Sequence, residues 1–221
     1  MNKKVNEAII NFQEKYTNEF FNSLMAYEKI ILIGKSNNGY ITSKEVTKKK
    51  ISREYIRLLE KKGAIEKVSR GIYILKNVIP DDFYIFQLRY PKTIFSHMTA
   101  LYLYNLTEEI PYVFDITCVR NYNVKTMNEN NIYYIDKSLL ELGKTTVKTN
   151  YGNLVYVYNL ERTICDIIKN SNRLDEEQVL KSLKKIIKNS NIKIDMLKLT
   201  DYSKKLKCHE KVMNSLRYYY E

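Results

Sequence analysis

The pattern of apolar and polar positions is most informative between residues 41 and 75, where a helical period gives way to a strand period. Helical spacing predicts two short helices, over 43–48 and 53–62, with a turn at 49–51 between them. Alternation of apolar and polar residues then predicts a β-hairpin over 65–75. Two helices joined by a turn and followed by a hairpin are typical of a winged helix-turn-helix, which we predict here.

The side chains of this segment predict how its helices begin and which faces they present. Ser43 and Ser52 stand where a hydroxyl can accept from free backbone N–H groups, so we expect them to cap the two helices. Apolar side chains recur on one side of the second helix, at Tyr55, Ile56, Leu58 and Leu59. Basic side chains recur at four-residue spacing on the other side, at Arg53, Arg57 and Lys61.

Positive charge is concentrated in the same segment. The chain has a formal net charge of +12, and Ile41 through Lys76 contains 8 Lys and 3 Arg against 4 Glu, so 11 − 4 gives +7. Such a concentration favours DNA binding, because each neutralised phosphate releases bound counterion. The predicted DNA contacts are Lys44, Ser52, Arg53, Tyr55, Arg57, Lys61, Lys67, Ser69 and Arg70. The alternative is an RNA- or protein-binding module in which the same elements serve only as a scaffold.

The sequence before residue 41 predicts helix, and the first proline predicts a domain boundary. One apolar series runs from Phe20 through Ile33, and an earlier one stands at Val5, Ile9, Phe12 and Tyr16. These series fit one kinked helix or two. Pro80, the first of three prolines, marks the predicted boundary between a domain of residues 1–79 and a second of residues 80–221.

The second domain is predicted to combine strands with helices. The expected strands are 112–119, 132–135, 144–149 and 154–158, and a turn signal at Asn150 to Asn153 joins the last two. Phe83 to Tyr90 fits either a helix or a strand. The expected helices are one from a Ser96 cap to 106, then 161–170, 175–189, 196–207 and 210–219. The predicted fold class is α+β: an N-terminal winged helix-turn-helix, then a mixed α/β C-terminal domain with a helical tail.

Three stretches of the chain resemble the AbiEi-type antitoxin and transcriptional regulator family of bacterial abortive-infection (type IV toxin–antitoxin) systems. They are KKGAIEKVSRGIYIL at 61–75, PKTIFSHMTAL at 91–101 and YNLERTICD at 158–166. The resemblance implies that the winged helix binds inverted repeats in its own promoter and represses the operon. It also implies that the C-terminal domain counteracts a nucleotidyltransferase-like toxin, without a stable complex between the two proteins.

Motifs for catalysis and metal binding are missing from the sequence. Gly34-Lys35-Ser36 is similar to the end of a phosphate-binding loop, but Lys29 stands where that motif requires its first glycine. There is no Gly-Ser dipeptide, with which the nucleotidyltransferase signature begins. His97 and His209 have no partner at zinc-ligand spacing, and we expect His97 to be half-buried and hydrogen-bonded rather than a proton shuttle. We therefore expect no catalytic residue, metal or cofactor.

Charged residues of the second domain leave two interpretations open. Arg162 and Asp166 stand four residues apart and can pair on a helix; a structural ion pair is the default interpretation, and Arg162 on a phosphate is the alternative. A degenerate nuclease or transferase that depends on Asp166 is a third hypothesis for the chain. Lysines on the 175–189 helix either bind a partner or are solvated. The candidate antitoxin surface consists of Arg162, Lys181, Lys184, Lys185 and Lys188.

The composition predicts a cytoplasmic protein that does not enter a membrane. No apolar run approaches the roughly 18 residues that a spanning helix needs, and the N-terminus lacks the apolar stretch of a signal peptide. Cys118, Cys165 and Cys208 are scattered and odd in number, which fits reduced thiols better than a disulfide framework.

Overall fold

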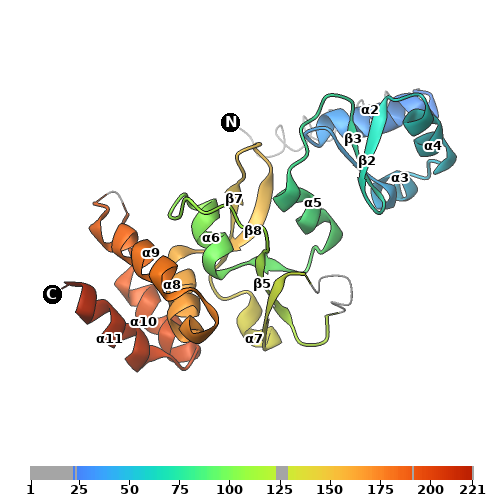
Figure 1. Ribbon diagram of the computed structural model, residues 1–221. Helices are drawn as coiled ribbons and strands as arrows, with labels where there is room; N and C mark the ends of the chain where they lie inside the picture. The colour runs from blue at the N-terminus through green and yellow to red at the C-terminus, as the bar shows by residue number, and fades with distance from the viewer. Residues whose placement is uncertain (1–21, 23, 123–128, 191, 221) are drawn as a thin grey trace, which may run out of the picture. The chain divides into compact units, whose positions relative to one another are not determined.

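The structure is a computed structural model that describes residues 22, 24–122, 129–190 and 192–220 (Figure 1). The helix predicted from the apolar series that begins at Val5 lies outside the described residues. The described chain is mixed α+β, and it divides into two compact units, the first ending at Ile85 and the second beginning at Phe86. This division lies within helix α5 (Asp82–Arg89); the boundary predicted between residues 79 and 80 stays a prediction.

The first unit packs short helices against a small antiparallel sheet. Its elements are α2 (Ala26–Ser36), β1 (Tyr40–Thr42), α3 (Ser43–Lys48), α4 (Glu54–Lys61), β2 (Ile65–Ser69) and β3 (Ile72–Leu75). The strands pair in the order β1-β3-β2. Aliphatic side chains from these helices and strands form one core: Ile30, Ile33, Ile41, Val46, Ile51, Ile56, Leu59 and Ile65. The two helices and the hairpin predicted over 43–75 are present, in the predicted order.

A glycine closes the connection from α2 to β1. Gly39 has a φ of +91°, in the left-handed region that favours glycine. Its N–H donates to the Gly34 carbonyl (2.7 Å), and its own carbonyl accepts from the Leu75 N–H (2.8 Å). A Cβ on Gly39 would come within 2.5 Å of the Val78 side chain. The close approach of Val78 therefore requires a residue without a side chain at this position.

The second unit contains a five-stranded mixed sheet. Its strands are β4 (Ile94–Phe95), β5 (Asp115–Val119), β6 (Asn131–Ile135), β7 (Lys144–Lys148) and β8 (Leu154–Tyr158), in the order β6-β5-β4-β8-β7. The short strand β4 lies at the centre, antiparallel to β5 and parallel to β8. Strand β7 pairs with β8 as the hairpin predicted from the Asn150–Asn153 turn, which is confirmed.

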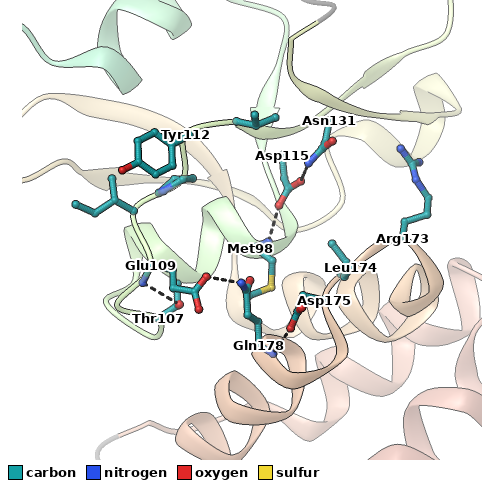
Figure 2. A pocket seen from close by; sticks show the side chains of 13 residues that line it. Met98, Thr107, Glu109, Tyr112, Asp115, Asn131, Arg173, Leu174, Asp175 and Gln178 are labelled. Atoms are coloured by element: carbon teal, nitrogen blue, oxygen red, sulfur yellow. Dashed lines mark hydrogen bonds between the residues drawn. The ribbon is translucent and has the colours of Figure 1, made fainter.

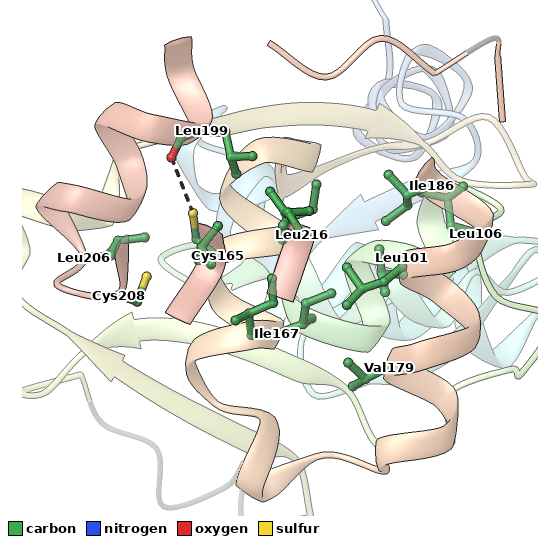
Figure 3. Close-up of a cluster of buried hydrophobic side chains, with 14 residues drawn as sticks. Leu101, Leu106, Cys165, Ile167, Val179, Ile186, Leu199, Leu206, Cys208 and Leu216 are labelled. Atoms are coloured by element: carbon green, nitrogen blue, oxygen red, sulfur yellow. Dashed lines mark hydrogen bonds between the residues drawn. The ribbon is translucent and has the colours of Figure 1, made fainter. Parts of the chain in front are cut away.

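Helices of the second unit surround a buried helix, α8. They are α6 (His97–Leu103), α7 (Lys137–Leu140), α8 (Leu160–Lys169), the 3-10 helix η1 (Ser171–Arg173), α9 (Glu176–Lys188), α10 (Met196–Lys205) and α11 (His209–Tyr220). Helix α8 contacts α6, α10 and α11, and residues 161–168 are all buried. Figure 3 shows the resulting core, in which Cys165 and Ile167 of α8 lie among leucines of α10 and α11. The predicted helical tail is confirmed.

Two predicted helix caps are wrong. The side chain that caps α3 is Thr42, which accepts from the Glu45 N–H (3.1 Å), and Ser43 instead uses its backbone N–H to bind the Gly71 carbonyl (2.8 Å). Ser96 precedes α6 as predicted, but its side chain makes no capping bond. Its hydroxyl accepts instead from Thr117 Oγ1 (3.0 Å). At Ser96 a tertiary hydrogen bond thus uses the hydroxyl that local sequence assigned to the helix, and at Ser43 the neighbouring Thr42 hydroxyl replaces it as the cap.

Replacing Gly39 by alanine should destabilise the first unit by roughly 2–5 kcal/mol, the sum of about 1–2 for left-handed strain and about 1–3 for overpacking. Gly63 is the matched control, because its φ is +67° but a Cβ there would meet nothing within 4 Å. Gly63→Ala should therefore cost only the strain, about 1–2 kcal/mol. Chemical denaturation followed by circular dichroism measures both variants, and equal costs would contradict the steric argument.

Candidate nucleic-acid interface

The turn between α3 and α4 is anchored by one buried residue. Ile51 packs into the core of the first unit, and its N–H donates to the Val46 carbonyl (3.1 Å). Lys50, just before it, has a φ of +59°, which reverses the chain direction. Helix α4 begins at Glu54, one residue later than predicted, so its N-cap is Arg53 rather than Ser52, although the Ser52 hydroxyl accepts from the Glu54 N–H (3.3 Å). The buried anchor fixes how α4 leaves the turn, and with it the face that α4 presents to solvent.

The basic side of α4 is exposed, as the sequence predicts. Arg53, Arg57 and Lys61 are all exposed. Arg53 Nε donates to Thr47 Oγ1 on α3 (2.9 Å), so the guanidinium is held across the turn. Its two terminal nitrogens make no hydrogen bond within the described part of the chain. They are therefore available for a bidentate contact with an acceptor pair.

The apolar side of α4 is narrower than predicted. Ile56 and Leu59 are buried, but the side chains of Tyr55 and Leu58 are 38% and 48% exposed. The helix packs mainly against α2 and β2, and the outer residues of the apolar arc remain in solvent. Tyr55 and Leu58, which the sequence placed on the apolar side, are therefore partly accessible, and the DNA contact predicted for Tyr55 stays a prediction.

The tip of the hairpin lies beside the start of α3, and the hairpin carries exposed basic residues. Lys67 and Arg70 are exposed, Ser69 is half-buried, and a register shift between Lys67 and Ser69 bends strand β2. The Gly71 carbonyl accepts from the Ser43 N–H at the start of α3 (2.8 Å). This bond fixes the hairpin tip to the first of the two helices.

A groove along α3 adds two more cations to this surface. Its volume is about 530 Å³, and it is lined by Thr42, Lys44, Glu45, Lys48 and Lys49. Both carboxylate oxygens of Glu45 accept from Asn37 Nδ2 (3.0 and 2.9 Å). Lys44 and Lys48 form no ion pair among the residues that the structure describes, so both charges face solvent uncompensated. We name the exposed cations of α3, α4 and the hairpin the basic face: Lys44, Lys48, Arg53, Arg57, Lys61, Lys67 and Arg70.

Comparison with known families assigns a class to this part of the chain. Residues 31–76 match the model of a family described as "Transcriptional regulator, AbiEi antitoxin". The match confirms the resemblance to AbiEi-type proteins over this segment, which contains the basic face, and it supports a general role as a regulator and antitoxin. No curated protein matches the chain. None of the helices in the described ranges is both long and apolar enough to cross a membrane.

Arg162 does not lie on a surface, which corrects its place in the candidate antitoxin surface. Its side chain is 1% exposed. Nε donates to both carboxylate oxygens of Asp166 (3.0 Å each), and Nη1 donates to the carbonyls of Leu139 and Leu142 (3.1 and 2.9 Å). The guanidinium also lies 4.2 Å from the ring centre of Tyr158. The structural ion pair, the default interpretation from sequence, is what the structure shows.

The lysines of α9 differ in how far they are paired. Lys181 forms an exposed ion pair with Glu177 (2.7 Å). Lys184, Lys185 and Lys188 are exposed, and none of them has an ion pair within the described ranges. They share a side of the helix away from buried Val179, Leu183 and Ile186, as predicted. Their role as an antitoxin surface stays a prediction.

His97 is fully buried rather than half-buried. Its Nε2 accepts from Asn170 Nδ2 (3.0 Å), which leaves the proton on Nδ1 for donation to Ser96 Oγ (2.9 Å). The imidazole stacks on the Tyr133 ring at 3.5 Å between centroids. Burial, followed by the charges of Arg162 and Arg173, holds the pKa of His97 well below its usual value. The ring is neutral with both nitrogens occupied, so it can neither shuttle protons nor bind a metal.

A second cavity, of about 320 Å³, has a mainly acidic lining, whereas a nucleic-acid site has a basic one (Figure 2). Glu109, Asp115 and Asp175 line it, against one cation, Arg173. Asp115 accepts from Asn131 Nδ2 (3.0 Å), and its burial raises the pKa of the carboxyl. The acidic lining repels phosphate, so this cavity does not extend the candidate interface.

Sequence reasoning missed Thr47 as the residue that orients Arg53, and Tyr133 as the ring between His97 and Arg173. The Arg173 guanidinium lies 4.3 Å from the centre of the Tyr133 ring, on which the His97 imidazole also stacks. His97, Tyr133 and Arg173 are separated from one another by at least 36 positions in the sequence. No local spacing reveals such a contact. Thr47 was detectable in principle, since a hydroxyl stands six residues before an arginine across a predicted turn.

Arg162→Met should destabilise the second unit by about 3–5 kcal/mol, because it leaves Asp166 buried without its counter-ion. Lys181→Met is the control: it breaks an exposed pair at the same four-residue spacing, which solvent screens, and should leave stability nearly unchanged. Denaturant unfolding of both variants gives the two costs. A loss below about 1 kcal/mol for Arg162→Met would show that the pair is not required for folding.

His97 should make stability depend on pH. The pKa of His97 is lower in the folded state than its unfolded value of about 6.5. Below pH 6.5 the unfolded chain therefore binds more protons at this residue than the folded chain does. The free energy of unfolding should therefore fall as pH drops below about 6.5, by at most about 1.4 kcal/mol per pH unit. Denaturation between pH 5 and 7.5 should show a flatter profile for His97→Gln. An equal slope in the two proteins would exclude His97 as the source.

Proposed function

We propose that the chain is a transcriptional autorepressor whose segment 40–76 is a winged helix-turn-helix that binds inverted repeats in its own promoter. The observation that carries the proposal is the arrangement of the basic face: arginines in line on α4, with a cationic hairpin tip fixed to α3 by the Ser43–Gly71 bond. Opposite charge on phosphates provides the affinity, and base-edge contacts provide the sequence preference.

Each part of the basic face has a role in this proposal. Arg53 and Arg57 enter the major groove, where an arginine can bind the edge of guanine in a bidentate manner. Ser52 and Tyr55 contact phosphate or a base at the edge of α4, and Lys44 and Lys61 add contacts to the backbone. Lys67, Ser69 and Arg70 of the hairpin hold the adjacent backbone or minor groove.

We further propose that the second unit provides the antitoxin activity against a nucleotidyltransferase-like toxin, acting in the cytoplasm without a stable complex. The family match supports a general antitoxin role. Lys184, Lys185 and Lys188 are the exposed cations of α9 that could contact a nucleic-acid or acidic partner of this activity. In this proposal the protein has no catalytic residue of its own.

A protein-binding module is the second candidate function, because Tyr55 and Leu58 are both partly exposed on α4. Exposed aromatic and aliphatic side chains are typical of protein interfaces. In that case the basic face would be a solvated surface. Salt titrations of binding to promoter DNA and to random RNA separate the two functions: only the DNA-binding function predicts a preference for the promoter.

Arg57→Ala should weaken binding to promoter DNA by roughly 1–3 kcal/mol and reduce the preference over unrelated DNA, since it removes a base contact. Lys67→Ala should weaken all sequences alike and reduce the salt slope by about one unit. Lys184→Ala removes the same charge from the second unit and should leave the binding unchanged. Gel shifts at several salt concentrations measure all three variants. Unchanged promoter binding by the double variant Arg53→Ala, Arg57→Ala would refute the DNA-binding proposal.

A further inference from the structure

A small polar cleft in the second unit has no role in the functions above. Its volume is about 130 Å³, room for several water molecules or one small anion. It lies between β6 and the C-terminal end of α8, and we name it the basic cleft. The residues that define it here are His97, Tyr133, Arg162, Asp166, Lys169 and Arg173.

The floor of the basic cleft carries no net charge. Arg162 is neutralised by Asp166, to which its Nε donates at 3.0 Å. His97 is neutral, because both of its ring nitrogens are engaged by Ser96 and Asn170. Any net charge that a ligand meets in the cleft therefore comes from the rim.

The rim carries two cations that are held in place without a carboxylate. Lys169 Nζ donates to the Leu206 carbonyl (2.9 Å), and the Arg173 guanidinium lies over Tyr133. Neither has a carboxylate oxygen within 4.0 Å among the described residues. Asp115, whose pKa reflects the field of Arg173, already accepts from the Met98 N–H (3.0 Å) and from a side-chain amide. The two rim charges are positioned and uncompensated.

We propose that the basic cleft binds the phosphate group of a small molecule, with Lys169 and Arg173 as its ligands. The Arg173 guanidinium is already held over a ring, so it loses little further conformational entropy when it binds a phosphate. Its planar N–H donors also match the spacing of phosphate oxygens. The proposal does not depend on DNA binding by the first unit.

The sheet limits what else can contact a ligand in the cleft. Tyr133 and its strand partner Thr117 face the cleft, whereas Tyr134, the next residue of β6, is turned to the opposite face of the sheet by strand alternation. On the other side of Arg173 the acidic cavity of Figure 2 excludes phosphate. Inorganic phosphate is therefore the simplest ligand, and nucleoside monophosphates are larger carriers of the same group.

Isothermal titration calorimetry of the full chain with inorganic phosphate and with the four ribonucleoside monophosphates tests the proposal. Arg173→Gln and Lys169→Gln should each weaken binding by roughly tenfold, the equivalent of one charge-assisted hydrogen bond, and Arg173→Lys should retain part of it. Both residues are exposed, so the variants should fold, and circular dichroism checks this. The control Lys198→Gln, Lys205→Gln removes two charges from surface ion pairs on α10 and should bind as the wild type does.

The probes themselves distinguish the carriers. If a nucleotide is the ligand, at least one nucleoside monophosphate binds more tightly than inorganic phosphate. If inorganic phosphate binds equally well, the cleft is a site for the phosphate group alone. Binding that is absent for every probe, or that survives in the double variant Lys169→Gln, Arg173→Gln, would overturn the proposal.

Discussion

The second unit depends on one buried cation. The Arg162 guanidinium binds Asp166 on its own helix, two carbonyls at the end of α7, and the face of Tyr158 on β8. Taking an arginine out of water is costly, and only a full set of partners compensates for that cost. Because those partners come from a helix, a connection and a strand, the compensation is available only when all three are in their native positions. The contacts of Arg162 outside its own helix thereby specify how α8 lies on the sheet.

The two units use basic residues in different ways. In the first unit the arginines and lysines of the basic face point into solvent around a largely aliphatic core, so their charge can act at long range on a polyanion. In the second unit Arg162 is buried in an ion pair that stabilises the fold, and Arg173 is fixed over an aromatic ring. Cations held in this way interact at short range, with groups whose geometry fits theirs. A net charge of +12 therefore does not describe one continuous surface.

Local pattern predicted much of this fold from the sequence. The hairpin over 144–158 follows from its turn residues, and α9 follows from the apolar spacing of its sequence. Strand β4 could not be predicted in this way, because its two residues are too few to show a period. Its central position comes from pairing with β5 and β8, which lie far along the chain.

In the candidate sites, too, some features follow from the local sequence and others depend on tertiary packing. The basic side of α4 is a matter of helical spacing, so the sequence identified its residues. The exposure of Leu58 could not be foreseen, since the width of the buried arc depends on which elements pack against α4. The sequence also paired Arg162 with Asp166 correctly, but the carbonyls and the ring that complete its environment come from distant segments.

In the proposed mode of DNA binding, the bond between the start of α3 and the Gly71 carbonyl has a consequence for the spacing of bases that the first unit would recognise. It joins the tip of the hairpin to the helix pair, so the two cannot be displaced independently along a duplex. A protein bound through both elements would then tolerate base changes between its contacts, but not the insertion or deletion of a base pair.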